Sequence, residues 1–554
     1  MLIGLAKLIL PPLPCPWPDL LCSSLRFAFD RSHGLGGICV SRSSSMSNEI
    51  DSSVHQRFSS RLGLLLSVLG IAIGTGNFWR FPRIAAQTGS DQGAGAFLVA
   101  WVVFLFLWSI PLIIAEYCLG RTSRQGTVGA FTILAGPRYS WMGAFVAFVT
   151  AAITFYYSVV VGWCIYYFVM MVATPLPTTT DAAMAAWNEL QGSMWPSVCH
   201  AIAIILGGAV VWRGIRSIER VNVVLMPLLL LTVLLSLLRA LTLPGAFEGL
   251  TYLFTPDWSQ LAHPRLWLEA LTQNAWDTGA GWGLFLTYGA YMRKEDTLAR
   301  NAFMTAIGNN TISLLAGMIV FGTVFAVLSH DMGLSRPEVL EIARASGPGS
   351  TGLTLIWMPQ LFARMGFGKL LACIFFFGLT IAGFTSLIAQ LELQIRVLVD
   401  AGWQRKKAIV FILVLAFVCG VPSALNLDFL GNQDFVWGVA LMLSGGLVAF
   451  AVVRRGAQRL RREEILASGS DLKLGVWWDF VMKYFVPCAA TVLMVWWLWL
   501  SATVYAPDDW YDPFNPSSVM TCLLQWGLVI AVLLALNRKL AATWASRPPL
   551  HKDS

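Results

Sequence analysis

The chain has 554 residues, of which 56% are hydrophobic and only 12% are charged. Soluble globular proteins carry about 25% charged residues, so this composition excludes a surface that faces water throughout and predicts a protein embedded in a lipid bilayer. The net charge of +8 does not indicate a nucleic-acid partner, because the Lys and Arg residues fall in short loops between apolar stretches. The ten cysteines form no CxxC pair and mark neither a metal site nor a disulfide.

The first 45 residues differ from the rest of the chain. They hold five closely spaced prolines, and the apolar run at residues 2–10 is too short to span a bilayer. No small-residue cleavage site of a signal peptide follows that run. We expect residues 1–56 to lie outside the folded domain, either as a disordered extension or because the true start is Met46.

Beyond this extension, apolar segments of about 20 residues recur, which is the length that a transmembrane helix requires. We therefore predict an all-α polytopic membrane protein with about twelve transmembrane helices. The predicted spans lie near residues 62–85, 95–119, 142–173, 195–212, 219–242, 265–292, 300–329, 367–399, 407–424, 433–453, 484–505 and 518–537.

Basic residues gather in alternate loops, after every even-numbered span and at both ends of the spanning region. The loops after the third, ninth and eleventh spans carry no Lys or Arg. By the positive-inside rule, both termini, including the tail at 541–554, are expected in the cytoplasm, with the spans in a plasma (inner) membrane. The mixed segment 331–366 is expected outside, as a folded loop with short helices.

Two predicted spans are interrupted by glycines. The first reads GIAIGTGN at residues 70–77, and the sixth reads WDTGAGWG at 276–283. Because they are five spans apart, each opens one five-helix half, as in transporters built from inverted repeats with unwound helices at the substrate site. The alternative is that these glycines serve only close helix packing, since Gly70 and Gly74 match a small-xxx-small motif.

Asp277 is an ionisable residue in the middle of a predicted span, where such groups usually mark function. With Asn77 and freed backbone carbonyls it offers oxygen ligands to a small cation; the alternatives are a structural ion pair or a neutral buried acid. Thr385 and Ser386, which follow Ala382 in the eighth span, could form a second cation site, or their hydroxyls could bond back to their own helix.

Arg80 ends the first apolar run, just before Pro82, and belongs to the outward half of the predicted pathway. It requires an anionic partner, for which Asp434 at the start of the tenth span is a candidate. The alternative is that Arg80 snorkels to the membrane interface.

These motifs resemble the neurotransmitter:sodium symporter family over roughly residues 57–540. The resemblance implies a LeuT-type fold, with inverted repeats at about 57–243 and 263–455 and two extra helices at about 484–540. The matching motifs are Arg61-Leu-Gly, GTGNFWRFP at 74–82, Ile110-Pro111-Leu112, Glu116, Gly120-Arg121, Tyr156-Tyr157, Gly214-Ile215, Ile218-Glu219-Arg220 and Ala382-Gly-Phe-Thr385-Ser386.

The resemblance also implies the residues of each site. The substrate would contact Ala72, Gly74, Gly76, Ile153, Tyr157, Trp276, Gly279, Trp282, Ser386 and Gln390. The first sodium site would comprise Ala72, Asn77, Asp277, Asn309 and the substrate carboxylate, and the second Gly70, Ile73, Ala382, Thr385 and Ser386. Tyr157 would hold the carboxylate and Trp276 would cover the pocket. Arg80 and Asp434 would form the outer gate, and Tyr291 and Asp400 would help to close the inner one, where His55 takes the place of the family's basic partner and Arg57 lies two residues on.

Departures from the family pattern indicate the cargo. Gly74 stands where monoamine transporters carry an aspartate, so the substrate is expected to bring its own carboxylate. Trp101 and Asp277 replace chloride-site hydroxyls, although Ser313 is of the chloride-binding type. A fixed carboxylate at Asp277 could supply the negative charge that two sodium ions and a zwitterion require in a dry site.

We therefore expect sodium-coupled, chloride-independent symport of a neutral amino acid by alternating access, with sodium as the coupling ion and no other cofactor. Gln390 adds a polar group that a purely aliphatic pocket would lack. The alternatives are a proton-coupled carrier with Asp277 as relay, and a membrane receptor that binds an amino acid without moving it. No nucleophile–base set, metal cluster or phosphate loop indicates an enzyme.

Overall fold

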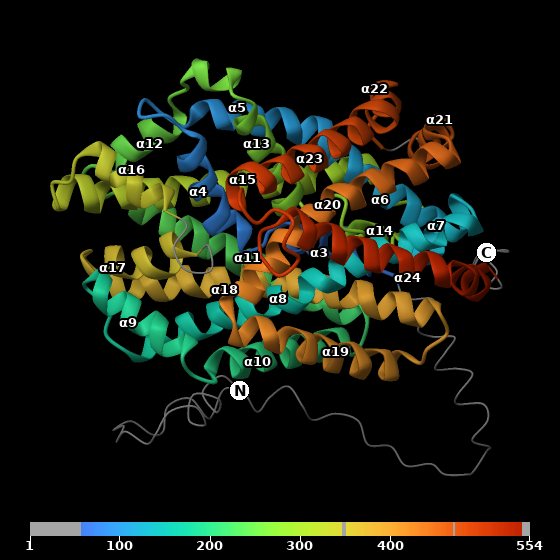
Figure 1. Cartoon of the computed structure of the whole chain (residues 1–554), viewed down its shortest axis with the longest axis horizontal. Coiled ribbons are helices and arrows are strands. Elements are labelled where there is room, and N and C mark those ends of the chain that lie inside the picture. Colours follow the sequence, from blue (N-terminus) through green and yellow to red (C-terminus); the bar gives the residue numbers. More distant parts are fainter. Residues whose placement is uncertain (1–56, 346–350, 469–470, 546–554) are drawn as a thin grey trace, which may run out of the picture. The chain divides into compact units, whose positions relative to one another are not determined.

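The computed structural model describes residues 57–345, 351–468 and 471–545. The predicted extension at 1–56 and most of the predicted tail lie outside the described residues. Those that are described form helices and connecting loops, without a strand (Figure 1). The helices are α3 (Arg61–Ala72), α4 (Gly76–Thr88), α5 (Gly95–Phe104), α6 (Ile110–Ser123), α7 (Thr127–Leu134), α8 (Ser140–Ala173), α9 (Thr180–Gln191), α10 (Trp195–Val211), α11 (Ile215–Leu241), α12 (Ala246–Phe254), α13 (Pro264–Asp277), α14 (Leu284–Gly289), α15 (Leu298–Val324), α16 (Arg336–Arg344), α17 (Met358–Ala363), α18 (Gly368–Asp400), α19 (Arg405–Leu425), α20 (Leu427–Arg455), α21 (Ala457–Leu460), α22 (Trp477–Phe480), α23 (Val486–Leu500) and α24 (Val519–Ala545).

The predicted all-helical membrane architecture is confirmed, but the count of twelve spans is not. Within the described residues, nine helices are long and apolar enough to cross a membrane, or up to eleven if two bent pairs each count as one span. The sixth predicted span is divided between α13 and α14, which have 14 and 6 residues and are each too short to cross alone. Short helices occupy the described part of 331–366, as expected.

The two glycine-rich motifs coincide with breaks in helices. α3 and α4 are bent by 47° relative to each other across a break that begins after Ala72. The stretch between α13 and α14 contains three glycines with positive φ, at +70° for Gly279, +93° for Gly281 and +80° for Gly283. L-residues with side chains rarely adopt this conformation, so glycine permits the chain to unwind here.

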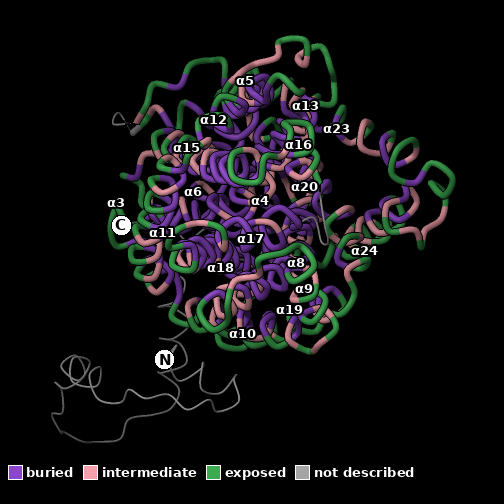
Figure 2. The backbone as a smooth tube through the Cα atoms, turned by 90° about the vertical axis from the view of Figure 1, so that its left-hand side faces the viewer, coloured by how far each residue is buried: buried purple, intermediate pink, exposed green. Residues whose placement is uncertain are grey.

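The broken helices lie in the interior, against long unbroken ones. α3 contacts α11, α15 and α18, whereas α4 contacts α13 and α15. α14 packs against α6, and α8 runs along α18. Figure 2 shows buried backbone concentrated around α4, α6 and α18, whereas exposed residues follow the periphery. The breaks are therefore held by neighbouring helices.

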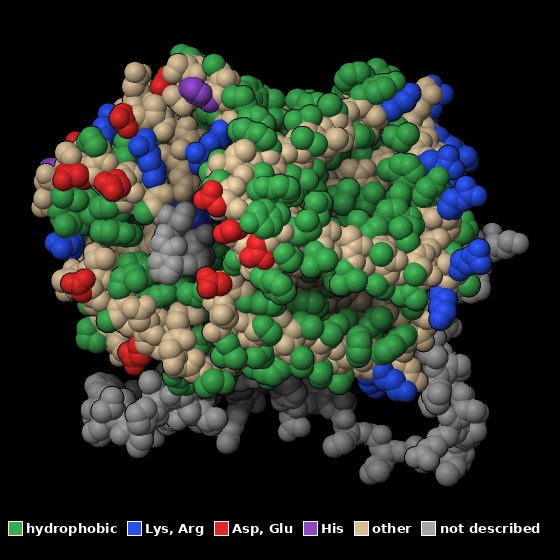
Figure 3. Space-filling view, in the orientation of Figure 1, with side chains coloured by type: hydrophobic (Ala, Val, Ile, Leu, Met, Phe, Trp, Pro, Cys, Tyr) green, Lys and Arg blue, Asp and Glu red, His purple; other side chains and the backbone are tan. Residues whose placement is uncertain are grey.

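The visible surface has charged side chains toward its two ends. Figure 3 shows a broad apolar surface, with Asp, Glu and some Lys and Arg toward one end and only Lys and Arg toward the other. The basic end is where α7, α21 and the last turns of α24 lie in the same orientation (Figure 1). By the positive-inside rule an end with only basic residues is expected in the cytoplasm, and this orientation stays a prediction.

Candidate functional site

The break between α3 and α4 brings the first span within reach of α8 and α18. A Cβ atom on Gly74 would lie 3.0 Å from the Tyr157 hydroxyl and 3.1 Å from the Ser386 hydroxyl. The backbone N–H and the hydroxyl of Thr75 both donate to the Tyr157 oxygen, at 3.3 and 3.4 Å. Only glycine leaves the Tyr157 and Ser386 hydroxyls this close to the backbone at position 74.

The break between α13 and α14 is held by a carboxylate from α6. Glu116, fully buried, accepts hydrogen bonds from the backbone nitrogen of Gly281 at 2.6 Å and from that of Leu286 at 3.1 Å. Buried N–H groups that lack a helical partner require another acceptor. Glu116 supplies it, so the unwound backbone has a fixed path.

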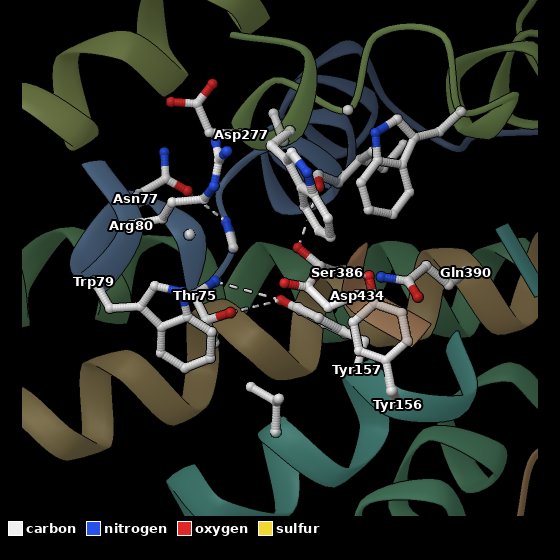
Figure 4. Close-up of a pocket in the computed structure, with 18 of the residues that line it drawn as sticks. Thr75, Asn77, Trp79, Arg80, Tyr156, Tyr157, Asp277, Ser386, Gln390 and Asp434 are labelled. Carbon is white, nitrogen blue, oxygen red and sulfur yellow. Dashed lines mark hydrogen bonds between the residues drawn. The ribbon is translucent and has the colours of Figure 1, made fainter. Parts of the chain in front are cut away.

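A pocket lies between the two breaks, and its walls come from helices far apart in the chain (Figure 4). Nine of the ten residues predicted to contact substrate line it; the exception is Ile153, which is buried in α8 but is not part of the lining. The lining comprises Ile71, Ala72, Gly74, Thr75, Gly76, Asn77, Trp79, Arg80, Arg83, Tyr156, Tyr157, Val160, Trp276, Asp277, Gly279, Trp282, Leu284, Ser386, Gln390, Leu430 and Asp434.

The residues predicted for the first sodium site come together at one edge of this pocket. The side-chain oxygen of Asn309 faces two backbone carbonyl oxygens, that of Ala72 at 3.1 Å and that of Asp277 at 3.0 Å. Asn77 donates to the same Asn309 oxygen at 2.8 Å and to the Ser313 hydroxyl at 2.7 Å. Carbonyl oxygens that face one another repel unless a donor or a cation lies among them. Either a flipped amide or a bound sodium ion satisfies this cluster.

The carboxylate of Asp277 is only partly satisfied by the protein. Its Oδ2 accepts hydrogen bonds from the Ser313 hydroxyl at 3.0 Å and from the Gln273 amide at 3.3 Å. Its Oδ1 is buried and has no hydrogen-bond partner among the described residues. A buried carboxylate oxygen without a donor is costly, which favours a cation or a proton close by.

The residues predicted for the second sodium site also meet, at the end of α3. The Ser386 hydroxyl faces three carbonyl oxygens, those of Gly70 at 3.3 Å, Ile71 at 3.1 Å and Ile73 at 3.2 Å. Thr385 instead bonds back to its own helix, with its hydroxyl 3.1 Å from the carbonyls of both Ile381 and Ala382. The back-bonding alternative thus describes Thr385, whereas Ser386 joins α18 to the broken helix.

The two residues of the predicted outer gate both line the pocket but do not pair directly in the described structure. Arg80 donates to Gln273 at 2.8 Å and lies 4.0 Å from a carboxylate oxygen of Glu269. Asp434 accepts a hydrogen bond from Tyr156 at 3.1 Å. The Arg80–Asp434 pair therefore stays a prediction for a closed state.

On the other side of the breaks, a polar network joins the residues predicted for the inner gate. The Tyr291 hydroxyl donates to Glu392 at 2.6 Å, and Glu392 also pairs with Arg405 at 2.6 Å. Asp400 pairs with Arg396 at 2.8 Å and accepts from the Gly126 backbone nitrogen at 2.6 Å. The expected partner His55 lies outside the described residues, and Arg57 is exposed near Arg216 and Arg293. None of the residues in this network lines the pocket between the breaks.

Several residues of the site were not assigned a role from the sequence. Glu116 and Glu392 are acidic residues within predicted spans, so the rule that identified Asp277 could have found both. Gln273 and Glu269 lie one and two turns before Asp277 in α13, the helix of the second break. Their partnership with Arg80 depends on the packing of α13 against α4, which no local pattern reveals.

Known proteins are similar to this chain over most of its length. The model of the sodium:neurotransmitter symporter family matches residues 55–195 and 188–545. An uncharacterized sodium-dependent transporter of Methanocaldococcus jannaschii is 30% identical over 79% of this chain and 89% of its own length. A sodium-dependent serotonin transporter of Drosophila melanogaster is 27% identical over 76% of this chain and 74% of its own.

Among solved structures, MhsT in complex with L-phenylalanine matches with a TM-score of 0.68 and 28% identity. The match covers 79% of this chain and 99% of that protein.

Proposed function

The chain belongs to the sodium:neurotransmitter symporter family and is a sodium-coupled membrane transporter, and we propose that it carries a neutral amino acid without requiring chloride. One observation carries the proposal: two broken helices face each other across a pocket in which the buried Oδ1 of Asp277 has no donor among the described residues. The substrate and the first sodium ion would bind there, the second sodium ion would bind at the end of α3, and transport would proceed by alternating access.

The cargo is argued from the polar groups around the first break. The hydroxyl of Tyr157, close to Thr75 and to the backbone at Gly74, is placed to donate to a carboxylate in the pocket. Position 74 offers no acid to an amine, so a ligand with an amine alone would lack a fixed partner there. A substrate that brings its own carboxylate supplies a ligand to the first sodium site as well.

Independence from chloride is argued from charge balance. Two sodium ions and a zwitterion bring a net charge of +2 into a site that excludes water, and uncompensated charge there is costly. The carboxylate of Asp277, held by Ser313 and Gln273, supplies a fixed negative charge beside the first cluster. A bound anion would then be unnecessary.

The state of the gates supports a cycle. The polar network of Tyr291, Glu392 and Arg405 connects α18 and α19 on one side, whereas Arg80 and Asp434 remain unpaired with each other on the other. These contacts support a state in which the inner gate is closed and the outer gate has not yet formed. We infer that pairing of Arg80 with Asp434 accompanies closure over the substrate, in a plasma membrane with both termini in the cytoplasm.

The test is uptake of a panel of labelled amino acids into proteoliposomes with an inward sodium gradient and gluconate in place of chloride. Sodium-dependent accumulation of a neutral amino acid is the expected result. Uptake that appears only with chloride would refute the proposed independence from chloride, which rests on Asp277, and would leave sodium-coupled transport standing. Substrate binding without uptake in either salt would favour a receptor.

Proton coupling is the second candidate, because the unpartnered oxygen of Asp277 could hold a proton instead of facing sodium. Replacing sodium by choline at fixed pH separates the two. Uptake that survives this replacement and follows an imposed pH gradient would establish the proton-coupled carrier.

A further inference from the structure

A buried amide on α11 has no hydrogen-bond partner among the described residues, although it lies beside the proposed second sodium site. Asn222 is 1% exposed, and neither its Oδ1 nor its Nδ2 has a hydrogen-bond partner among the described residues. An amide in the interior of a protein normally bonds through both atoms, and leaving it unsatisfied is costly. A water molecule or an ion bound beside it would satisfy this amide.

The amide points toward α3 at the level of Gly70. The Oδ1 of Asn222 lies 3.3 Å from the position that a Cβ of Gly70 would occupy, and the Cβ of Thr385 lies 3.3 Å from the same point. Because Gly70 has no side chain, Asn222 and Thr385 both border the space that its Cβ would occupy. Both Gly70 and Thr385 belong to the proposed second sodium site.

A second unpartnered polar group lies on the same part of α3. Ser67 is fully buried, and its hydroxyl has no partner among the described residues. Because residues three apart share a helix face, Ser67 lies one turn below Gly70, toward the start of α3. Near that start, Glu219 of α11 accepts hydrogen bonds from Ser59 and Ser60. Polar groups therefore follow the α3–α11 contact from the start of α3 to the proposed cation site.

We propose that the side-chain oxygen of Asn222 is a further ligand of the second sodium ion, bound directly or through one water. An amide oxygen is the hard, neutral donor that sodium prefers, and it needs no proton exchange to bind. The other oxygen ligands of the ion would be carbonyls of α3 and hydroxyls of α18, which approach it from two sides. The Asn222 oxygen would approach it from a third side. This inference rests on the proposed function, because it assigns a residue to one of its ion sites.

The test uses purified full-length protein and measures sodium binding directly, by scintillation proximity with radioactive sodium and by the sodium-dependent rise in melting temperature. Asn222→Leu keeps the size but removes the ligand, and should raise the half-saturating sodium concentration about tenfold. Asn222→Asp keeps the shape and adds charge, and should lower that concentration. Ser423→Ala in α19, which deletes a buried hydroxyl that also has no partner among the described residues, should leave the half-saturating concentration unchanged.

A double-mutant comparison assigns the effect to one ion site. Asn222→Leu combined with Thr385→Ala should be less than additive in sodium affinity, because both would act on the same ion. Asn222→Leu combined with Asn309→Ala should be additive, because Asn309 belongs to the other cluster.

Each outcome bears on a different claim. If the wild type responds to sodium but neither Asn222 variant changes the sodium concentration required, this inference is wrong and the proposed function stands. If the wild type shows no sodium response, both the proposed function and this inference are wrong. Should Asn222→Leu not fold, the isosteric Asn222→Asp still decides, since an unchanged sodium affinity there also contradicts the assignment.

Discussion

Glu116 accepts hydrogen bonds from two backbone nitrogens of the unwound segment, that of Gly281 at 2.6 Å and that of Leu286 at 3.1 Å. Glu116→Ala leaves both buried donors without an acceptor and should destabilise the protein by about 2–4 kcal/mol. Thermal unfolding in detergent measures the loss. Glu463→Ala, which breaks an exposed pair with Arg459, is the control and should cost less than about 1 kcal/mol. Equal losses in the two variants would contradict the role of Glu116.

Gly74 is expected to tolerate no side chain, because a Cβ there would lie 3.0 Å from the Tyr157 hydroxyl and 3.1 Å from that of Ser386. Gly74→Ala should displace both hydroxyls and weaken amino-acid binding by about tenfold or more, while the protein remains folded. Gly431→Ala, at a position where a Cβ meets nothing within 4 Å, is the matched control. Equilibrium binding of labelled substrate gives the comparison, and unchanged affinity in Gly74→Ala would place the substrate elsewhere.

Tyr291→Phe removes the 2.6 Å hydrogen bond to Glu392 and should weaken closure of the inner side. Hydrogen bonds to charged groups contribute about 1.5–3 kcal/mol, so the population of inner-open molecules should rise about tenfold or more. Hydrogen–deuterium exchange in α14 and the start of α7 would report the change as faster exchange. Tyr288→Phe, three residues earlier in α14, removes a buried hydroxyl that has no partner among the described residues and should leave exchange unaltered. Identical exchange in the two variants would show that Tyr291 does not hold the gate.

Gln390 is expected to select among amino-acid side chains. It lines the pocket with Trp276 and Trp282, and its Oε1 is buried without a partner among the described residues. A substrate with a polar side chain can satisfy this amide, whereas an aliphatic one leaves it unpaired. Gln390→Leu should therefore shift the preference for leucine over glutamine about tenfold toward leucine. Competition against uptake of the native substrate measures the ratio, which corrects for differences in expression, and an unchanged ratio would remove Gln390 from the specificity determinants.

Asp277→Ser is expected to make transport depend on chloride. The substitution removes the fixed negative charge and leaves a hydroxyl beside Ser313 and Asn77, where an anion could bind. Uptake by this variant in gluconate should fall well below its uptake in chloride, whereas the wild type should not distinguish the two salts. A variant inactive in both salts but still able to bind sodium would indicate that the carboxylate serves another purpose.

The helix breaks could be predicted from local sequence, but the partners across the pocket could not. Runs of glycine beside Asn77 and Asp277 located both breaks, because unwinding is a property of the backbone at those positions. Whether Arg80 meets Asp434 or Glu269 depends on how α4, α13 and α20 sit in one state of the cycle, and a sequence does not specify a state.

Other expectations can be compared residue by residue. The predicted span at 265–292 was expected to be interrupted at 276–283, and three positive-φ glycines there separate α13 from α14. Ile153 was placed in the pocket by resemblance, whereas it lies buried in α8 beyond the lining. Asn222 was not predicted as a site residue, because a single asparagine in an apolar helix has no distinctive spacing. Only the structure shows that its amide lacks a partner among the described residues.

The Ser386 hydroxyl meets the carbonyls of Gly70, Ile71 and Ile73, and the Asn309 oxygen meets those of Ala72 and Asp277, so backbone atoms make up much of both proposed ion sites. A mutation exchanges side chains and leaves such oxygens in place. Variants with altered pocket walls can therefore acquire a new cargo while the same ionic gradient continues to drive it. In this architecture, substrate specificity and coupling to the sodium gradient can evolve separately.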